Sequence, residues 1–154
     1  MLENIIPNQT LEMENVLSFR EILLEEEVVS ISNGLENIIR DTGAEKAGPT
    51  VTATHDIDVE KGEIDLEIKI PLSKKIESSG RYEVLPEFKV ENALKMRVIG
   101  ETHDTDACMQ ALQLYIKENS LIPTTPLYIA TVQEAKKPGQ LRDMIIDLYI
   151  GIKN

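Results

Sequence analysis

The chain carries an internal repeat, and this feature constrains its fold more than any other. When the sequence is shifted against itself by half its length, apolar residues, a proline and an Ala-Thr pair fall on identical residues. These matches join Leu35 to Leu112, Ile39 to Ile116, Pro49 to Pro126, Ala53-Thr54 to Ala130-Thr131, and Gly62 to Gly139. When the shift is increased by five residues, Ile64-Asp65-Leu66 matches Ile146-Asp147-Leu148. A fixed period of this kind predicts two copies of one structural unit.

The first copy predicts the order strand, helix, strand, strand. Residues 16–20 and 50–55 are typical of strands, and Ile64 to Ile70 alternates with charged residues, which predicts a strand with one buried and one wet face. A helix is expected over 25–42, because its apolar residues recur at helical spacing and carboxylates occupy its first turn. Gly43 is expected to end the helix, and Lys61-Gly62 is expected to form a turn.

The second copy repeats this order. Strands are expected over 94–99, 127–132 and 144–152, and a helix begins within 102–106. The buried stripe of that helix holds Cys108, Ala111, Leu112, Tyr115 and Ile116. The prediction is one α+β domain, 1–154, with repeat 1 over about 15–72, a linker over about 73–80 and repeat 2 over about 81–153. We expect an antiparallel sheet, two helices on one face and a cleft between the two copies.

Composition and charge exclude several classes of function. The formal net charge of −11 and the 4% of aromatic residues disfavour nucleic acids and anionic membranes as partners. The longest apolar runs are far too short to span a bilayer, and the first fifteen residues lack the pattern of a signal peptide. A single cysteine suits a reducing compartment. We therefore expect a cytoplasmic protein without a cofactor.

Several segments carry a resemblance to a known family. Gly48-Pro49, residues 57–72, Tyr115 to Asn119, Thr125-Pro126 and residues 146–152 resemble the GyrI-like effector-binding domain, which also serves bacterial AraC-type and MerR-type regulators. The resemblance implies duplicated, SH2-like β-α-β-β units around a central cleft that accepts lipophilic, often cationic, small molecules. Most members of the family lack chemistry, and some are reported to be hydrolases. The carboxylate that many members place in the strand after the second helix is replaced here, since Tyr128 and Ala130 align with that place and Glu134 is the nearest acid.

The candidate ligand-binding residues are tyrosines, acids and one histidine. Tyr128 and Tyr149 each offer an apolar ring and a hydroxyl group. Asp65 and Asp147 align across the repeat, and in a shared groove desolvation would raise the pKa of both carboxylates. The remaining candidates are His55, which would line the cleft, and Glu134.

The sequence offers no catalytic or metal-binding motif. Glu101, His103, Asp104 and Asp106 have metal-ligand chemistry, but acids at this place suit the start of a helix. Cys108 lies on the apolar stripe of the second helix, so we expect a core residue rather than a nucleophile. No metal site and no enzymatic activity are expected.

Three functions remain open at this stage. The first is a binding domain for an apolar or weakly cationic small molecule. The second is a protein-interaction module, and a weaker similarity to small proteins encoded beside type VII-secreted toxins suggests an accessory partner of such a toxin. The third is a small hydrolase on the same fold. A homodimer is compatible with each of them.

Overall fold

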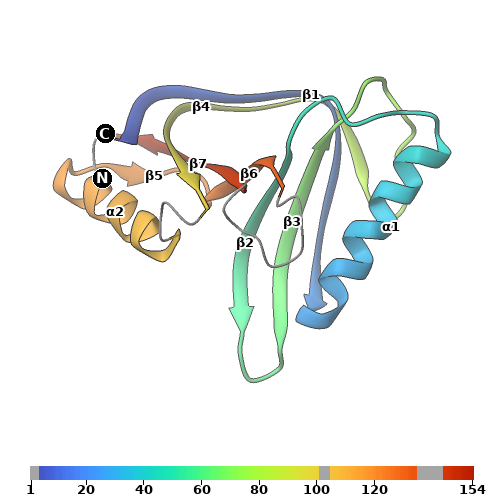
Figure 1. Cartoon of the computed structure of the whole chain (residues 1–154), viewed down its shortest axis with the longest axis horizontal. Coiled ribbons are helices and arrows are strands. Elements are labelled where there is room, and N and C mark those ends of the chain that lie inside the picture. The colour runs from blue at the N-terminus through green and yellow to red at the C-terminus, as the bar shows by residue number, and fades with distance from the viewer. Residues whose placement is uncertain (1–3, 101–104, 135–143) are drawn as a thin grey trace. The chain divides into compact units, whose positions relative to one another are not determined.

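The computed structural model describes residues 4–100, 105–134 and 144–154 (Figure 1). The chain divides into two compact units. We call Met13–Phe88 the N-terminal unit, and Lys89–Asn154 together with Met1–Glu12 the C-terminal unit. The elements are β1 (Ile5–Leu24), a 3-10 turn (Glu25–Glu27), α1 (Val28–Asp41), β2 (Thr50–Asp58), β3 (Glu63–Pro71), β4 (Glu83–Ile99), α2 (Thr105–Glu118), β5 (Ile122–Pro123), β6 (Tyr128–Gln133) and β7 (Ile145–Lys153).

In the N-terminal unit, β3 pairs antiparallel with both β1 and β2. Alternate residues of β3 point to one face, where they pack with α1 in an aliphatic core. That core contains Leu17, Phe19, Leu23, Leu35, Ile39, Ala44, Leu66, Ile68, Ile70, Leu72 and Ile76. The other face of β3 is not wet as predicted, because Glu67 and Lys69 are also buried there.

The limits of α1 follow from local chemistry. A carboxylate oxygen of Glu27 accepts a hydrogen bond from the backbone N–H of Leu24 at 2.9 Å, which satisfies a donor at the start of the helical segment. At the other end, Thr42 Oγ1 donates to the carbonyl of Ile39 at 2.7 Å. Gly43 follows with φ +78°, a conformation that glycine adopts without strain. The predicted helix and its stop are confirmed.

In the C-terminal unit, β7 pairs antiparallel with β4 and with β6, and its last residues pair with the short strand β5. The core of this unit contains Ile5, Leu94, Met96, Val98, Cys108, Leu112, Ile116, Ile146, Leu148 and Ile152. Cys108 is 7% exposed, which confirms its prediction as a core residue. Among the described helices, none is long and apolar enough to span a membrane.

The strand registers correct the sequence alignment of the two copies. In the N-terminal unit Glu67 lies opposite Arg20 and Ala53, and in the C-terminal unit Asp147 lies opposite Arg97 and Ala130. Asp147 is therefore the counterpart of Glu67, and the predicted equivalence of Asp65 and Asp147 is wrong. The error has a simple cause. A slip of two residues along a strand preserves which face each side chain points to, so the Ile-Leu alternation does not distinguish the two alignments.

Two further expectations change with the structure. The first strand begins at Ile5 rather than near residue 16. Two asparagines within strands have a positive φ, which is +50° for Asn15 of β1 and +51° for Asn92 of β4. Asparagine tolerates this left-handed conformation better than most residues. The segment 73–80 is not only a linker, because Ile76 is 7% exposed and packs in the N-terminal core. The boundary between the units falls later, after Phe88.

Candidate functional site

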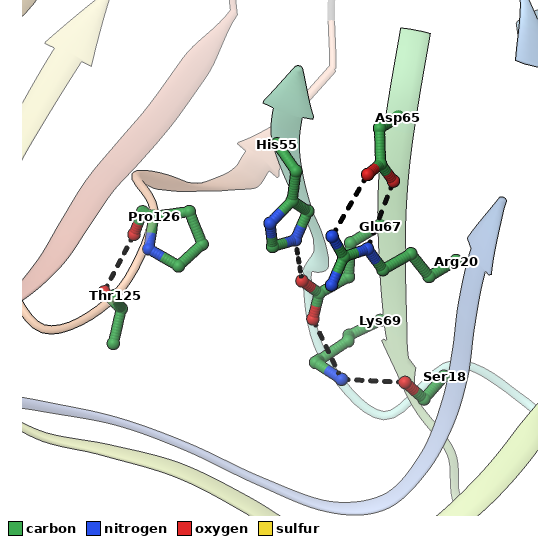
Figure 2. A network of polar contacts seen from close by, with 8 residues as sticks. All are labelled: Ser18, Arg20, His55, Asp65, Glu67, Lys69, Thr125 and Pro126. Atoms are coloured by element: carbon green, nitrogen blue, oxygen red, sulfur yellow. Dashed lines mark hydrogen bonds and ion pairs between the residues drawn. The ribbon is translucent and has the colours of Figure 1, made fainter. Parts of the chain in front are cut away.

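A buried network of charged side chains lies on β3 of the N-terminal unit (Figure 2). Glu67 Oε1 lies 2.6 Å from His55 Nε2, and Glu67 Oε2 lies 3.0 Å from Lys69 Nζ. Lys69 Nζ also donates a hydrogen bond to Ser18 Oγ at 2.7 Å. Because a carboxylate only accepts, the hydrogen in the first contact belongs to His55 Nε2. The network therefore joins β1, β2 and β3 through side chains.

A β-bulge places His55 in this network. Thr54 lies opposite Leu66 and Asp56 lies opposite Asp65, so His55 is an extra residue on β2 without a partner in the ladder. A bulge of this kind re-aims a side chain relative to the regular alternation of the strand. His55 is consequently directed to Glu67 rather than to open solvent, and its side chain is 20% exposed.

Burial and pairing set the charges of the network. The side chains of Glu67 and Lys69 are only 10% and 8% exposed. Burial raises the pKa of Glu67, but hydrogen bonds from His55 and Lys69 outweigh it, and the pKa lies below its ordinary value. The ammonium group of Lys69 also lies 4.6 Å from the centre of the Phe88 ring, at cation–π distance. Glu67 is thus held as a carboxylate and Lys69 is held in one place.

Lys69 forms part of the wall of a cavity of about 360 Å³. We call this the cationic cavity, and its lining residues are Ser18, Arg20, Lys69, Ser79, Gly80, Arg81, Tyr82, Glu83 and Leu85. Three of them are basic and one is acidic, although the whole chain has a net charge of −11. The three hydroxyl groups add further hydrogen-bonding positions. All of these residues belong to the N-terminal unit.

Carboxylates outside the lining fix the two arginines of the cationic cavity. Arg20 donates two hydrogen bonds to Asp65, both of 3.1 Å (Figure 2). Arg81 donates to Glu21 at 2.9 and 3.3 Å, and its guanidinium lies 5.9 Å from the centre of the Phe19 ring. The hydrogen bonds from Arg20 hold the pKa of Asp65 below its usual value. The expectation that desolvation in a groove raises this pKa is therefore wrong.

A second, smaller recess of about 160 Å³ lies on β1, β2 and β3 of the same unit and has the opposite charge. We call it the acidic recess, and it is lined by Ile22, Asp56, Asp58, Glu63 and Asp65. Within the described parts of the chain, no group of three His, Cys, Asp or Glu side chains is arranged to hold a metal ion.

The C-terminal unit has its own buried carboxylate. Asp147 is 3% exposed and accepts two hydrogen bonds from Arg97, of 2.8 and 3.0 Å. Asp147 also raises the pKa of Arg97, because the pair stabilises the protonated guanidinium. Lys95 Nζ lies 3.7 Å from Asp147 and 5.7 Å from the centre of the Tyr149 ring. Asp147 is therefore paired with basic side chains of its own unit, and its contact with a ligand stays a prediction.

The other predicted residues have different environments. Tyr128 lies opposite Tyr149 on paired strands, and its side chain is 6% exposed, whereas Tyr149 is half-buried. Glu134 is exposed just after β6. Ligand contact by these three residues remains a prediction. The cluster of Glu101, His103 and Asp104, like Gly139, lies outside the described residues.

Sequence reasoning missed most of the cationic cavity. Of the predicted ligand-binding residues, the structure brings His55 and Asp65 next to its walls, through Glu67 and Arg20. Lys69 and Arg81 were not predicted at all. The pattern of β3 gave no signal for Lys69, since Glu67 and Lys69 alternate with Leu and Ile residues as solvent-facing side chains do.

Solved structures share this fold over nearly the whole chain. A structure of an EcmrR–DNA complex matches with a TM-score of 0.73 and 12% identity over 98% of this chain, but this chain spans only 58% of the length of the matched chain. The EcmrR C-terminal domain matches with a TM-score of 0.66 and 13% identity, over 96% of this chain and 98% of that one. A hydrolase from Listeria innocua matches with a TM-score of 0.60 and 10% identity, over 97% of this chain and 90% of that one. SAV2435 bound to tetraphenylphosphonium matches with a TM-score of 0.54 and 10% identity, over 97% of this chain and 93% of that one.

These identities establish the fold and nothing finer. The α+β fold of the GyrI-like type that the sequence resemblance implies is confirmed by the structure and by these neighbours. No protein-family model matches the chain. No curated protein matches it in sequence either.

Proposed function

We propose that the protein binds a small organic molecule in the cationic cavity and catalyses no reaction on it. The observation that carries the proposal is the cavity itself, of about 360 Å³ and lined by side chains that ion pairs already hold in place. Binding sites for small molecules have volumes of roughly 300–1,000 Å³. A neighbour of the same fold is bound to tetraphenylphosphonium, which supports ligand binding as a use of this fold.

The charge of the ligand decides which of the two recesses would bind it. The family resemblance implies a lipophilic cation, and the cationic cavity disfavours such a ligand because three basic side chains line it. The acidic recess offers carboxylates beside Ile22, whose side chain is 66% exposed. Its volume of about 160 Å³ is small for an organic molecule. We therefore place the principal ligand in the cationic cavity and keep a cation in the acidic recess as the alternative.

The absence of catalysis rests on the state of the carboxylates. A carboxylate that activates water works best when its pKa is raised toward the operating pH. The pKa values of Glu67 and Asp65 are both lowered, and both carboxylates are occupied by hydrogen-bond donors. A neighbour from Listeria innocua is described as a hydrolase, so this point requires a direct assay. We expect hydrolysis of 4-nitrophenyl esters by the protein to equal that of the Glu67→Gln variant, and a rate that depends on Glu67 would contradict the proposal.

Amide chemical shifts test the binding site directly. A panel of naphthalene compounds with neutral, anionic and cationic head groups is titrated into the ¹⁵N-labelled protein. We expect at least one compound to shift the signals of residues 79–83 and of Lys69. The same compound, at about 100 times its dissociation constant, stabilises the protein by about 2.7 kcal/mol. If no compound shifts these signals at millimolar concentration, or if the shifts are confined to other residues, the proposed site is wrong.

The second candidate function is a protein-interaction module. It is favoured by exposed apolar side chains at the β2–β3 hairpin, where Ile57 is 51% and Val59 is 85% exposed. Exposed apolar side chains that gather in a patch mark interaction surfaces. If this candidate is right, Val59→Ser abolishes capture of a partner and leaves the chemical-shift titration unchanged.

A further inference from the structure

We propose that the cationic cavity selects an oxyanion, that is, a small organic molecule with a carboxylate or a phosphate group. This inference rests on the proposed function, since it names the class of ligand for the same site. The first argument is charge. Arg20, Lys69 and Arg81 line the cavity against one acid, Glu83. The carboxylates that pair with them, Asp65, Glu67 and Glu21, lie outside the lining. A ligand in the cavity therefore meets the basic groups before their counter-charges, and at short range this order favours an anion.

The second argument is that the cations are fixed before a ligand arrives. Lys69 is held by Glu67, Ser18 and the ring of Phe88. Arg81 uses Nε and Nη2 toward Glu21. Because the guanidinium is a rigid planar fork, its remaining donors face away from that carboxylate. A ligand that meets fixed donors loses less affinity to the ordering of side chains.

The third argument is the direction of the hydroxyl groups. Ser18 Oγ accepts the hydrogen bond of Lys69, and Ser79 Oγ accepts a hydrogen bond from the backbone N–H of Arg81 at 3.3 Å. Each hydroxyl group therefore retains its own hydrogen to donate. Carboxylate and phosphate oxygens only accept hydrogen bonds, and such bonds to a charged acceptor are the strong ones. Leu85 and the ring of Tyr82 supply an apolar wall for the organic part of the ligand.

The test compares head groups on one ring system. We measure by calorimetry the binding of 2-naphthoate, 2-naphthyl phosphate, the neutral 2-naphthamide and the cationic 2-naphthamidinium. At least one oxyanion is expected to bind about tenfold more tightly than the amide, which is the effect of one charge-assisted hydrogen bond. Its affinity falls as salt rises from 0.05 to 0.5 M, values at which screening of exposed charges increases. The oxyanion that binds more tightly shows whether the cavity prefers a carboxylate or a phosphate group.

Variants assign the selectivity to the cavity. Arg81→Gln removes one lining charge from an exposed ion pair, so the fold is retained. We expect it to weaken oxyanion binding about tenfold and to leave amide binding unchanged. The matched control is Arg40→Gln, which makes the same change in charge on α1, outside the cavity lining. Thermal melts of both variants verify that they are folded.

The outcomes separate this inference from the proposed function. If the amide or the amidinium binds at residues 79–83 as tightly as the oxyanions, the cavity binds ligands but the inference is wrong. If Arg40→Gln weakens oxyanion binding as much as Arg81→Gln does, the effect is one of net charge and the inference is also wrong. If no compound binds at these residues, the proposed function itself fails.

Discussion

The substitution Glu67→Gln tests the buried network most directly. It keeps the size of the side chain and one acceptor oxygen but removes the negative charge between His55 and Lys69. The side chain of Lys69, 8% exposed, then remains buried without its counter-charge. Breaking a buried ion pair from one side costs about 3–5 kcal/mol, because the remaining charge is desolvated and unpaired.

For Glu67→Gln, the structure favours a loss of stability at the lower end of this range of free energies. Lys69 keeps its hydrogen bond to Ser18 and its contact with the Phe88 ring, and the amide oxygen of the glutamine still accepts a hydrogen bond. We therefore expect the free energy of unfolding to fall by about 3 kcal/mol at pH 7. For a chain of this size, this corresponds to a decrease of about 6–12 °C in the melting temperature.

The effect has a defined dependence on pH. The pKa of Glu67 is lower in the folded protein than its ordinary value of 4.5, so its ionised form favours folding. This contribution is complete above pH 4.5 and is lost as the pH falls through the folded pKa. The difference in stability between the wild type and Glu67→Gln should therefore narrow below pH 4.5.

Urea denaturation at pH 7 and at several values below pH 4.5 measures both effects. The control is Glu36→Gln in the same unit, since Glu36 is half exposed and lies 3.8 Å from Lys46. Such a surface pair contributes at most about 1 kcal/mol. The account of the network is refuted if Glu67→Gln costs no more than this control at pH 7, or if its cost is the same at every pH.

Three further substitutions test the fold. Gly34→Ala in α1 should stabilise the protein by about 0.5–1 kcal/mol in urea denaturation, because a Cβ there meets no atom within 4 Å and alanine is the better helix former. Gly151→Ala should destabilise it by about 1–3 kcal/mol, since a Cβ would lie 2.8 Å from Thr124 Oγ1 and close to two other side chains. Asp147→Asn should cost about 1.5 kcal/mol by calorimetry, because it weakens the charge-assisted hydrogen bonds from Arg97, whose side chain is 50% exposed and stays solvated. Stability unchanged by the first two would contradict the packing described for their units.

The sequence predicted the elements whose pattern is local. The helix α1 was predicted because its apolar spacing, its N-terminal acids and Gly43 agree with one another. The strand β3 was predicted from strict alternation. In contrast, β1 extends eleven residues earlier than the expected start at residue 16, where asparagines such as Asn8 with φ +59° interrupt the strand-like composition.

The candidate site was harder to predict because its contacts join residues that are distant in the sequence. Lys69 alternates with apolar residues, and such a pattern normally indicates a solvent-facing position. Its burial depends on Ser18, on Phe88 and on a bulged residue of β2, and no local pattern shows that these meet. Arg81 follows a stretch of serines and a glycine that is typical of a linker. The function of such residues depends on tertiary packing rather than on spacing.

The registers also explain why the cationic cavity belongs to one unit. Arg20 and Arg97 occupy the same place on β1 and β4, opposite Glu67 and Asp147. In the C-terminal unit the arginine pairs with this opposite carboxylate, and Ile145 stands at the register place that corresponds to Asp65.

In the N-terminal unit the carboxylate opposite the arginine has other partners. Glu67 turns to the bulged His55 and to Lys69, whereas the bulge of β6 carries Val132 at the equivalent place. Arg20 pairs with Asp65 instead and lies in the cavity wall. In the N-terminal unit Glu67 is thus occupied by His55 and Lys69, and Arg20, paired with Asp65, lines the cavity. This arrangement depends on His55, Asp65 and Lys69, whose places in the C-terminal unit are taken by the neutral residues Val132, Ile145 and Tyr149.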